Sequence, residues 1–165
     1  MLDFQGKDET LLHTIADRKE HQPEAISYYK DASKTEKTDS CSNFGSLQAI
    51  KVVKRNQSGV ILELELDFQN GAVSVQSEYN MRAILGCGIT NINLLDGSSV
   101  EMSILPSAYI SIQAKGDGTY AVLGGGYGHG IGMSQNGAQK LCGQGFDYKR
   151  ILNYFIRIQN LSLIH

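Results

Sequence analysis

The residues whose types and spacing could do chemistry gather in the segment GGGYGHGIGMSQNGAQ, from Gly124 to Gln139. His129 could donate to a buried carbonyl or a sugar hydroxyl, and Ser134 and Gln135 could present a hydroxyl and an amide to the same ligand. The glycines that alternate along this segment are Gly124, Gly126, Gly128, Gly130 and Gly132. Glycine permits positive φ and a close approach of the backbone to another group. The pattern therefore predicts either a binding loop or a tight crossing of backbone against the core.

The segment follows a predicted strand and leads into a predicted helix, as phosphate-binding loops do. The dinucleotide pattern GxGxxG fails, because His129 and Ile131 stand where the third glycine is required. The Walker pattern fails as well, because Ala138 and Gln139 replace its Lys and Ser/Thr. We therefore expect no nucleotide cofactor.

Metal binding and nucleophilic catalysis are also disfavoured. No second His lies at helical or loop spacing from His129, and the three cysteines form no CxxC pair. His129 and Ser134 as a catalytic pair would lack both the GxSxG elbow and an acidic partner. Ser134 is explained more simply as the N-cap of the following helix. We expect no metal and no other cofactor.

The composition points to one modest domain. The chain has 165 residues, 17 acidic and 15 basic side chains, and 41% apolar residues, with a pI near 6.1. This balance, without a basic patch that contains aromatic residues, argues against nucleic acid as a partner. No signal peptide and no apolar run of about 20 residues is visible. If Met1 is the natural start, the expected location is the cytoplasm.

The element pattern predicts an α+β fold, with a β-rich antiparallel core, a short middle helix and two C-terminal helices. Residues 1–45 read as a weakly ordered polar lead-in, and folding is expected to begin near Ser46. In 60–68, four apolar residues alternate with Glu63, Glu65 and Asp67, which predicts one packed and one wet face. Asn70 and Gly71 predict a two-residue hairpin turn. The other predicted strands are 49–55, 72–78, 90–96, 98–105, 107–115 and 119–125.

The predicted helices have recognisable ends. The middle helix covers 77–86, with Ser77 as N-cap and Gly86 as its stop. The first C-terminal helix covers 134–143 and the second begins at Asp147 as N-cap. Its expected buried stripe consists of Tyr148, Ile151, Leu152 and Phe155.

Several segments of the sequence resemble the SpoIID/LytB family, which contains stage II sporulation protein D and the amidase enhancers of cell-wall turnover. The resemblance rests on GGGYGHGIGMSQNGAQ followed by QGFDYKRILNYF, and on SGVILELEL, EYNMRAIL and LPSAYISI upstream. It covers about Gln48 to Phe155. It identifies residues 46–165 as the C-terminal part of a SpoIID/LytB-type domain, and residues 1–45 as a remnant of its upstream half.

The resemblance implies binding to denuded peptidoglycan glycan strands and, for stage II sporulation protein D, lytic transglycosylase activity that uses one catalytic Glu. It implies stacking of a sugar on Tyr127 and hydrogen bonds from His129, Ser134 and Gln135. It also implies a location outside the cytoplasm or at a membrane anchor, at the cell wall or forespore septum, and a wall amidase or another sporulation hydrolase as a possible partner.

The catalytic Glu of the family lies upstream in a Gly-Glu element before Pro, which this chain lacks. A truncated reading frame, a fragment or a partner-dependent half-domain would each explain this. Three functions stay open: a truncated domain that binds glycan without cleaving it, a non-catalytic module that binds glycan and enhances an amidase, and an enzyme that uses Glu78 or Glu101 instead. No catalytic residue is identified.

Overall fold

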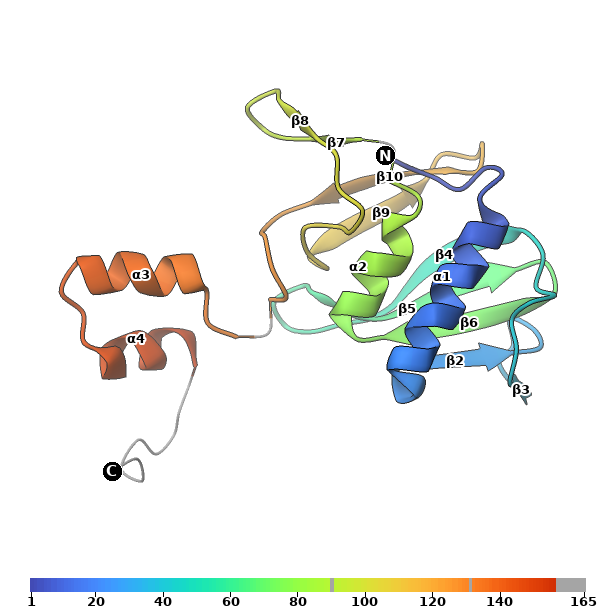
Figure 1. The fold of residues 1–165 in the computed structure, drawn as a ribbon, viewed down its shortest axis with the longest axis horizontal. Coiled ribbons are helices and arrows are strands. Elements are labelled where there is room, and N and C mark those ends of the chain that lie inside the picture. Colours follow the sequence, from blue (N-terminus) through green and yellow to red (C-terminus); the bar gives the residue numbers. More distant parts are fainter. Residues whose placement is uncertain (90, 131, 157–165) are drawn as a thin grey trace. The chain divides into compact units, whose positions relative to one another are not determined.

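The computed structural model describes residues 1–89, 91–130 and 132–156. They form two compact units, 1–130 and the part of the chain from 131 onward, and each is described by itself. The α+β class is confirmed: all strand pairs are antiparallel, a short helix lies in the middle of the sequence, and two helices lie near its end (Figure 1).

The largest sheet has five strands in the order β3-β2-β6-β5-β4. Its members are β2 (Ile26–Tyr29), β3 (Lys37–Thr38), β4 (Leu47–Arg55), β5 (Ile61–Phe68) and β6 (Gly71–Gln76). Helices α1 (Asp8–His21) and α2 (Glu78–Gly86) cover one face of this sheet (Figure 1). A short 3-10 helix, η1 (Pro23–Ala25), connects α1 to β2.

A second sheet has three strands in the order β1-β10-β9, formed by β1 (Leu2–Asp3), β10 (Thr119–Gly124) and β9 (Ile110–Ala114). The pair β7 (Ile92–Asn93) and β8 (Ser99–Val100) forms a small hairpin. The predicted strands 90–96 and 98–105 are therefore mostly turn and loop, and Thr90 lies outside the described residues.

The core of the first unit joins both sheets and both helices. Its largest fully buried side chains are Leu2, Leu11, Ile15, Ile26, Ile61, Leu64, Leu66, Val73, Val75, Met81, Ile84 and Leu85. Four of these precede Ser46, so the prediction that folding begins there is wrong. Leu11 and Ile15 lie four positions apart and share one face of α1, a short stripe that packs on the sheet. That residues 46–165 are the end of a longer domain stays a prediction.

Strand β5 and its turn depart from the prediction in register. A β-bulge opposite Lys54 and Arg55 places Ile61 in the core and leaves Leu62 exposed. The hairpin pairs Phe68 with Gly71, so the turn residues are Gln69 and Asn70 instead of Asn70 and Gly71. Gly71 is needed because a Cβ there would lie 2.5 Å from the Phe44 ring.

The middle helix ends at Gly86 as predicted, and its residues Met81, Ile84 and Leu85 are buried. The capping prediction for Ser77 is wrong, because its side chain makes no cap hydrogen bond and its φ is 73°. The positive φ places the chain in the left-handed region before the helix.

The second unit contains α3 (Gln135–Gly143) and α4 (Tyr148–Phe155). Both predicted caps are confirmed: the Gly137 amide donates to Ser134 Oγ at 3.1 Å and the Arg150 amide to Asp147 Oδ1 at 2.8 Å. In the predicted stripe of α4, Ile151 is buried, whereas Tyr148 is exposed.

Candidate functional site

The glycine-rich loop begins at the end of β10, and its glycines serve two different purposes. Gly126, Gly128 and Gly130 have φ of 78°, 123° and 68°, the region that side chains with a Cβ rarely adopt. Gly124 is required for space instead, since a Cβ there would lie 2.6 Å from Ile110 Cγ2. Both features predicted for the loop, positive φ and a close crossing against the core, therefore occur, at different glycines.

A second segment, the LPSAY stretch between β8 and β9, holds this loop in place. Ser107 Oγ donates to the Gly125 carbonyl at 2.6 Å and accepts from the Tyr109 amide at 3.2 Å. The Gly128 amide donates to the Pro106 carbonyl at 2.9 Å, and the Gly125 amide to the Tyr109 carbonyl at 3.1 Å. Ser107 is itself buried. The glycine loop is thus fixed through both its backbone and one hydroxyl.

Helix α2 in turn holds the LPSAY stretch. Arg82 Nε donates to the Leu105 carbonyl at 2.7 Å, and the Leu105 amide donates to the Arg82 carbonyl at 3.2 Å. Glu78 Oε2 lies 3.0 Å from the Arg82 guanidinium, one helical turn away. Ser107 and Arg82 are functional candidates that the sequence reasoning missed. The signal was available in the sequence. Arg82 lies in EYNMRAIL and Ser107 in LPSAYISI, two of the segments on which the resemblance rests.

A groove of about 770 Å³ runs beside the glycine loop within the first unit. None of the described side chains that line it is charged. They include Tyr127, Pro106 and Ser107 near the loop, Leu94 and Val100 from the β7–β8 hairpin, and Val122 from β10. Tyr127 is 83% exposed, so one face of its ring is available to a ligand.

The structure brings only some of the predicted site residues together. Tyr127 and His129 belong to the glycine loop of the first unit, and both are exposed. Ser134 and Gln135 are exposed at the start of α3, in the second unit. A joint site of all four side chains therefore stays a prediction. Because Ser134 Oγ accepts the cap bond, its own proton is still available for donation.

The two alternative acids have ordinary structural settings. Glu78 forms the ion pair with Arg82 described above, and Glu101 is exposed in the loop after β8. Neither lies among the residues that line the groove.

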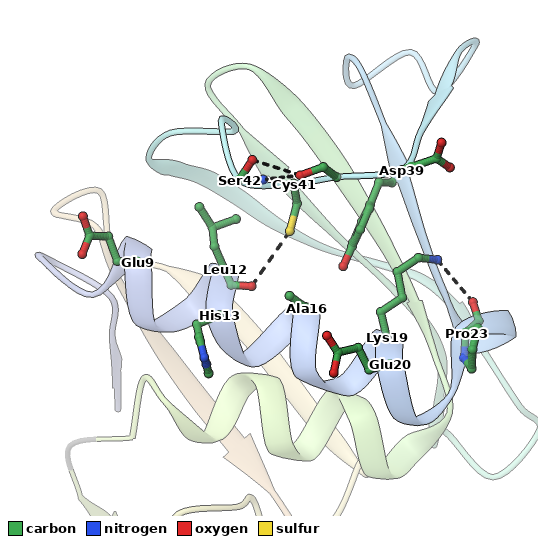
Figure 2. Close-up of a pocket in the computed structure, with 12 residues that line it drawn as sticks. Glu9, Leu12, His13, Ala16, Lys19, Glu20, Pro23, Asp39, Cys41 and Ser42 are labelled. Carbon is green, nitrogen blue, oxygen red and sulfur yellow. Dashed lines mark hydrogen bonds between the residues drawn. The ribbon is translucent and has the colours of Figure 1, made fainter.

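A second cleft, of about 580 Å³, lies between α1 and the segment Asp39–Ser42 (Figure 2). Two of its lining side chains have backbone partners. Lys19 Nζ donates to the Ile26 carbonyl at 2.6 Å, and the Cys41 thiol lies 3.9 Å from the Leu12 carbonyl. Burial raises the pKa of Cys41, so this thiol is protonated at neutral pH and is a poor nucleophile. Cys41, Cys87 and Cys142 are all free.

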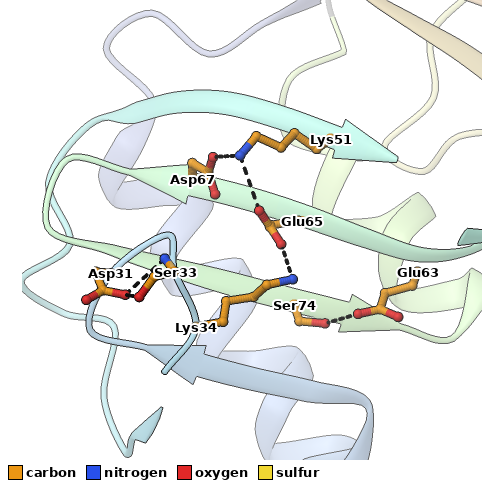
Figure 3. Close-up of polar contacts among 8 residues, drawn as sticks. All are labelled: Asp31, Ser33, Lys34, Lys51, Glu63, Glu65, Asp67 and Ser74. Atoms are coloured by element: carbon orange, nitrogen blue, oxygen red, sulfur yellow. Dashed lines mark hydrogen bonds and ion pairs between the residues drawn. The ribbon is translucent and has the colours of Figure 1, made fainter. Parts of the chain in front are cut away.

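A charged cluster occupies the sheet face away from the helices (Figure 3). Lys34 and Lys51 both pair with Glu65, the second at 3.3 Å, and Lys51 also pairs with Asp67. Glu65 and Asp67 are only 5% and 8% exposed, so the predicted wet face is wrong at these two positions. Lys34, from the loop between β2 and β3, and Lys51 of β4 pair with these carboxylates, and strand alternation does not reveal such partners.

The charges also shift the pKa values within this cluster. Burial raises the pKa of Glu65, but the hydrogen bond and charge of Lys34 and the hydrogen bonds of Asp67 and Lys51 together lower it more, so the pKa lies below its ordinary value. The hydrogen bond to Glu65 raises the pKa of Lys34 above its ordinary value. These groups stabilise the fold and lie apart from the residues of the groove.

No three His, Cys, Asp or Glu side chains among the described residues could hold a metal ion together. No helix within residues 1–89, 91–130 and 132–156 has the length and apolar character that crossing a membrane requires.

Comparison with known proteins gives one relative and one family. The amidase enhancer of Bacillus subtilis (strain 168) is 32% identical over 82 residues, which are 50% of this chain and 11% of that protein. The chain thus spans about a tenth of the length of this curated relative. No solved structure matches the chain. The model of a family described as a domain of unknown function, DUF8618, matches residues 17–132, from within α1 to just beyond the glycine loop. Since residues 17–132 are well over half of this chain, the chain belongs to the DUF8618 family.

Proposed function

We propose that this chain is a cell-wall module that binds peptidoglycan glycan strands without cleaving them. The observation that carries the proposal is the glycine loop, fixed by Ser107 and Pro106 beside a groove that no charged side chain of the described residues lines, with the exposed ring of Tyr127 next to it. Sugar rings offer an apolar face for stacking on an aromatic ring and a rim of hydroxyl and amide groups for hydrogen bonds. A fixed backbone reduces the entropy lost when such a ligand binds.

The relative's name supports a role at the cell wall, because it is called an amidase enhancer. The finer resemblance, to stage II sporulation protein D acting at the wall or forespore septum, is part of the proposal. Cleavage is not part of it, since neither Glu78 nor Glu101 lies among the residues that line the groove.

The test is co-sedimentation of the purified chain with insoluble glycan strands from which the peptides have been removed. We expect Tyr127→Ala and His129→Ala each to weaken binding by about tenfold, as loss of a stacking or hydrogen-bonding group does. Tyr148→Ala is the matched control, because Tyr148 is an exposed tyrosine on α4. Binding that is equal for the wild type and both loop variants would contradict the proposal.

Chromatography of the soluble products tests the absence of cleavage. We expect no soluble 1,6-anhydro sugars from these peptide-free strands after prolonged incubation. If they are released, Glu78→Gln and Glu101→Gln decide whether either residue is the acid. Loss of release in one of these variants, with glycan binding kept, would favour the enzyme that the sequence left open.

A second candidate function is enhancement of a wall amidase, and the name of the relative is the observation that favours it. If the chain enhances by presenting glycan, its addition raises the rate at which a wall amidase releases peptides from intact peptidoglycan. Tyr127→Ala should remove the increase together with glycan binding. An unchanged rate in the presence of wild-type chain would exclude this second function while leaving glycan binding intact.

A further inference from the structure

The side chains that line the groove beside the glycine loop are neutral throughout the described residues. They are apolar, aromatic, amide or hydroxyl groups. Asp96 and Glu101, the acidic residues in and just after the β7–β8 hairpin, do not line the groove. The Asp96 carboxylate instead accepts hydrogen bonds from the Ser98 amide and hydroxyl, at 2.9 Å and 2.6 Å. A charged group in the groove would therefore meet no opposite charge on a described lining side chain.

The proposed ligand contains one neutral and one charged sugar in each repeat. Hydrolysis of the amide bond that attaches the peptide leaves a free carboxylate on N-acetylmuramic acid, whereas N-acetylglucosamine has no charged group. Taking a charge out of water without a partner costs far more than taking out a hydroxyl or an amide that finds hydrogen bonds. The lining therefore favours N-acetylglucosamine over its charged neighbour.

Two asparagines in the lining offer an amide donor and an amide acceptor. Asn91 Nδ2 donates to Asn93 Oδ1 at 3.0 Å, and Ser99 Oγ donates to the same oxygen at 3.0 Å. Asn91 Oδ1 and Asn93 Nδ2 make no hydrogen bond to another described residue. An acetamido group has the complementary pair, an N–H and a C=O. Its methyl group fits the apolar side chains of the hairpin that line the groove, such as Leu94 and Val100.

We propose that the groove binds N-acetylglucosamine through its acetamido group, while the carboxylate of the neighbouring N-acetylmuramic acid stays in water. The inference rests on the proposed glycan binding and deepens it, because it names the sugar that the site selects. The exposed ring of Tyr127 provides the stacking face beside this sugar. The groove volume of about 770 Å³ lies within the range of roughly 300–1,000 Å³ for small-molecule sites.

The acetamido group makes binding sensitive to a chemical modification of the strand. Hydrolysis of this group releases acetate and leaves a primary amine, which is an ammonium ion at about pH 5.5. The ammonium cannot accept a hydrogen bond from Asn93 Nδ2, and no described lining side chain matches its charge. De-N-acetylated sugars should therefore not enter the groove.

The probes are the tetrasaccharide of N-acetylglucosamine and its fully de-N-acetylated form, each titrated into the ¹⁵N-labelled chain at about pH 5.5. We expect chemical-shift changes at Asn91, Asn93 and Tyr127, and an affinity at least about tenfold higher for the acetylated form. About 0.15 M salt screens the attraction of the cationic form to the chain, whose formal charge is -2 at pH 7. Tyr127→Ala identifies groove binding, because only binding in the groove should depend on this ring.

Chemical acylation separates the effect of the acetamido group from that of the charge. Treatment of the de-N-acetylated tetrasaccharide with acetic anhydride restores the acetamido group and should restore binding. Treatment with succinic anhydride also forms amides, but each of them carries a carboxylate. The succinylated form should therefore bind at least about tenfold more weakly than the acetylated form.

A substitution in the chain should change the preference. Asn93→Asp keeps an oxygen that can accept from Asn91 and Ser99, but it replaces the amide donor with a negative charge. We expect weaker binding of the acetylated form and tighter binding of the de-N-acetylated form, so that the ratio of the two affinities changes by about tenfold. Asn43→Asp is the matched control, because Asn43 is exposed and does not line the groove. Its ratio should equal that of the wild type.

Three results would overturn the inference. The first is equal, Tyr127-dependent binding of the acetylated and de-N-acetylated forms, which would leave the proposed glycan binding intact. The second is restored binding after succinylation, or the same change of ratio in Asn93→Asp and Asn43→Asp. The third is binding of peptide-free strands without binding of the acetylated tetrasaccharide, which would make N-acetylmuramic acid the selected sugar. If neither the strands nor the tetrasaccharide binds, the proposed function itself is wrong.

Discussion

Ser107 shows how one hydroxyl can set the geometry of a binding loop. It is buried, and it bonds at once to the Gly125 carbonyl and the Tyr109 amide, so it joins the start of the glycine loop to the start of β9. Without this hydroxyl, the Gly125 carbonyl would lose its donor and the Tyr109 amide would lose its acceptor. The position of the loop therefore depends on this side chain more than on the glycines alone.

We expect Ser107→Ala to lower the free energy of unfolding by about 1–2 kcal/mol. Amide exchange at Gly125 and Gly128 should accelerate more than exchange in β5. Ser98→Ala is the control, because the Ser98 hydroxyl donates to exposed Asp96, and this substitution should cost less than about 0.5 kcal/mol. Denaturant unfolding and hydrogen exchange provide the measurements. Equal effects of the two substitutions would contradict this view of Ser107.

Glu65 is a buried carboxylate that pairs with two lysines. Its lowered pKa means that its contribution is present above the ordinary pKa of Glu and is lost as the pH falls through the folded value. The raised pKa of Lys34 has the opposite sign, so its contribution is present below the ordinary pKa of Lys and is lost on alkalinisation. The ion pair thus stabilises between about pH 5 and pH 10.

We expect Glu65→Gln to lower stability by about 1–2 kcal/mol at pH 7, between the values for exposed and buried pairs, because both lysines remain partly exposed. The difference from the wild type should be smaller at pH 3 than at pH 7, because the contribution of Glu65 is lost as the pH falls from the ordinary pKa of Glu toward its lowered pKa. Glu36→Gln removes the exposed pair with Lys30 and should change stability little. Unfolding curves at the two pH values test this, and a difference that does not depend on pH would contradict it.

At the scale of elements, α2 is fixed by the closeness of its last turn to the chain that follows β8. A Cβ on Gly86 would lie 2.0 Å from the Ser103 carbonyl oxygen, and that backbone leads directly to Leu105, which Arg82 holds. This close packing and the hydrogen bond from Arg82 connect the helix to the LPSAY stretch. The glycine loop is supported by the stretch and, through it, by the helix.

Gly86→Ala should therefore cost about 2–3 kcal/mol, because backbone must shift to make room. Gly143→Ala, also at the end of a helix, meets nothing within 4 Å and should be neutral or stabilise by up to about 1 kcal/mol. Thermal unfolding of the two variants provides the comparison. Similar melting temperatures would show that α2 can move away from Ser103 without cost.

At the scale of the whole molecule, the first 45 residues are part of the core. Leu11 and Ile15 of α1 and Ile26 of β2 are at most 1% exposed. Asp8 accepts from the Leu47 amide at 2.9 Å, and Asn80 of α2 donates to Gln22 at 2.9 Å. The sheet cannot keep a dry face without this segment.

A chain from residue 46 onward should accordingly lose cooperative unfolding and most of its near-ultraviolet circular dichroism. A chain of residues 1–130, which is a compact unit, should keep both. Circular dichroism during heating distinguishes them. If the chain from residue 46 onward unfolds cooperatively, residues 1–45 are a lead-in and not part of the core.

Local patterns in the sequence determined much of this fold. Two helix caps, the stop at Gly86, most strands of the larger sheet and the α+β class follow from side-chain period and capping chemistry, which act between near neighbours. The glycine loop could be located for the same reason. The turn at Gly71 was misplaced by one residue because its glycine serves the Phe44 ring, which lies far away in the sequence.

Only the tertiary structure shows which residues make stabilising contacts with segments that are remote in the sequence. The pairing of Glu65 with two lysines, the packing of α1 in the core, and the hydrogen bonds of Ser107 and Arg82 all depend on segments that are remote in the sequence. Periodicity indicates which side of a strand is apolar, but it contains no information on which other segment will cover the polar side. That is set by sheet order and register, which exist only once the chain is folded.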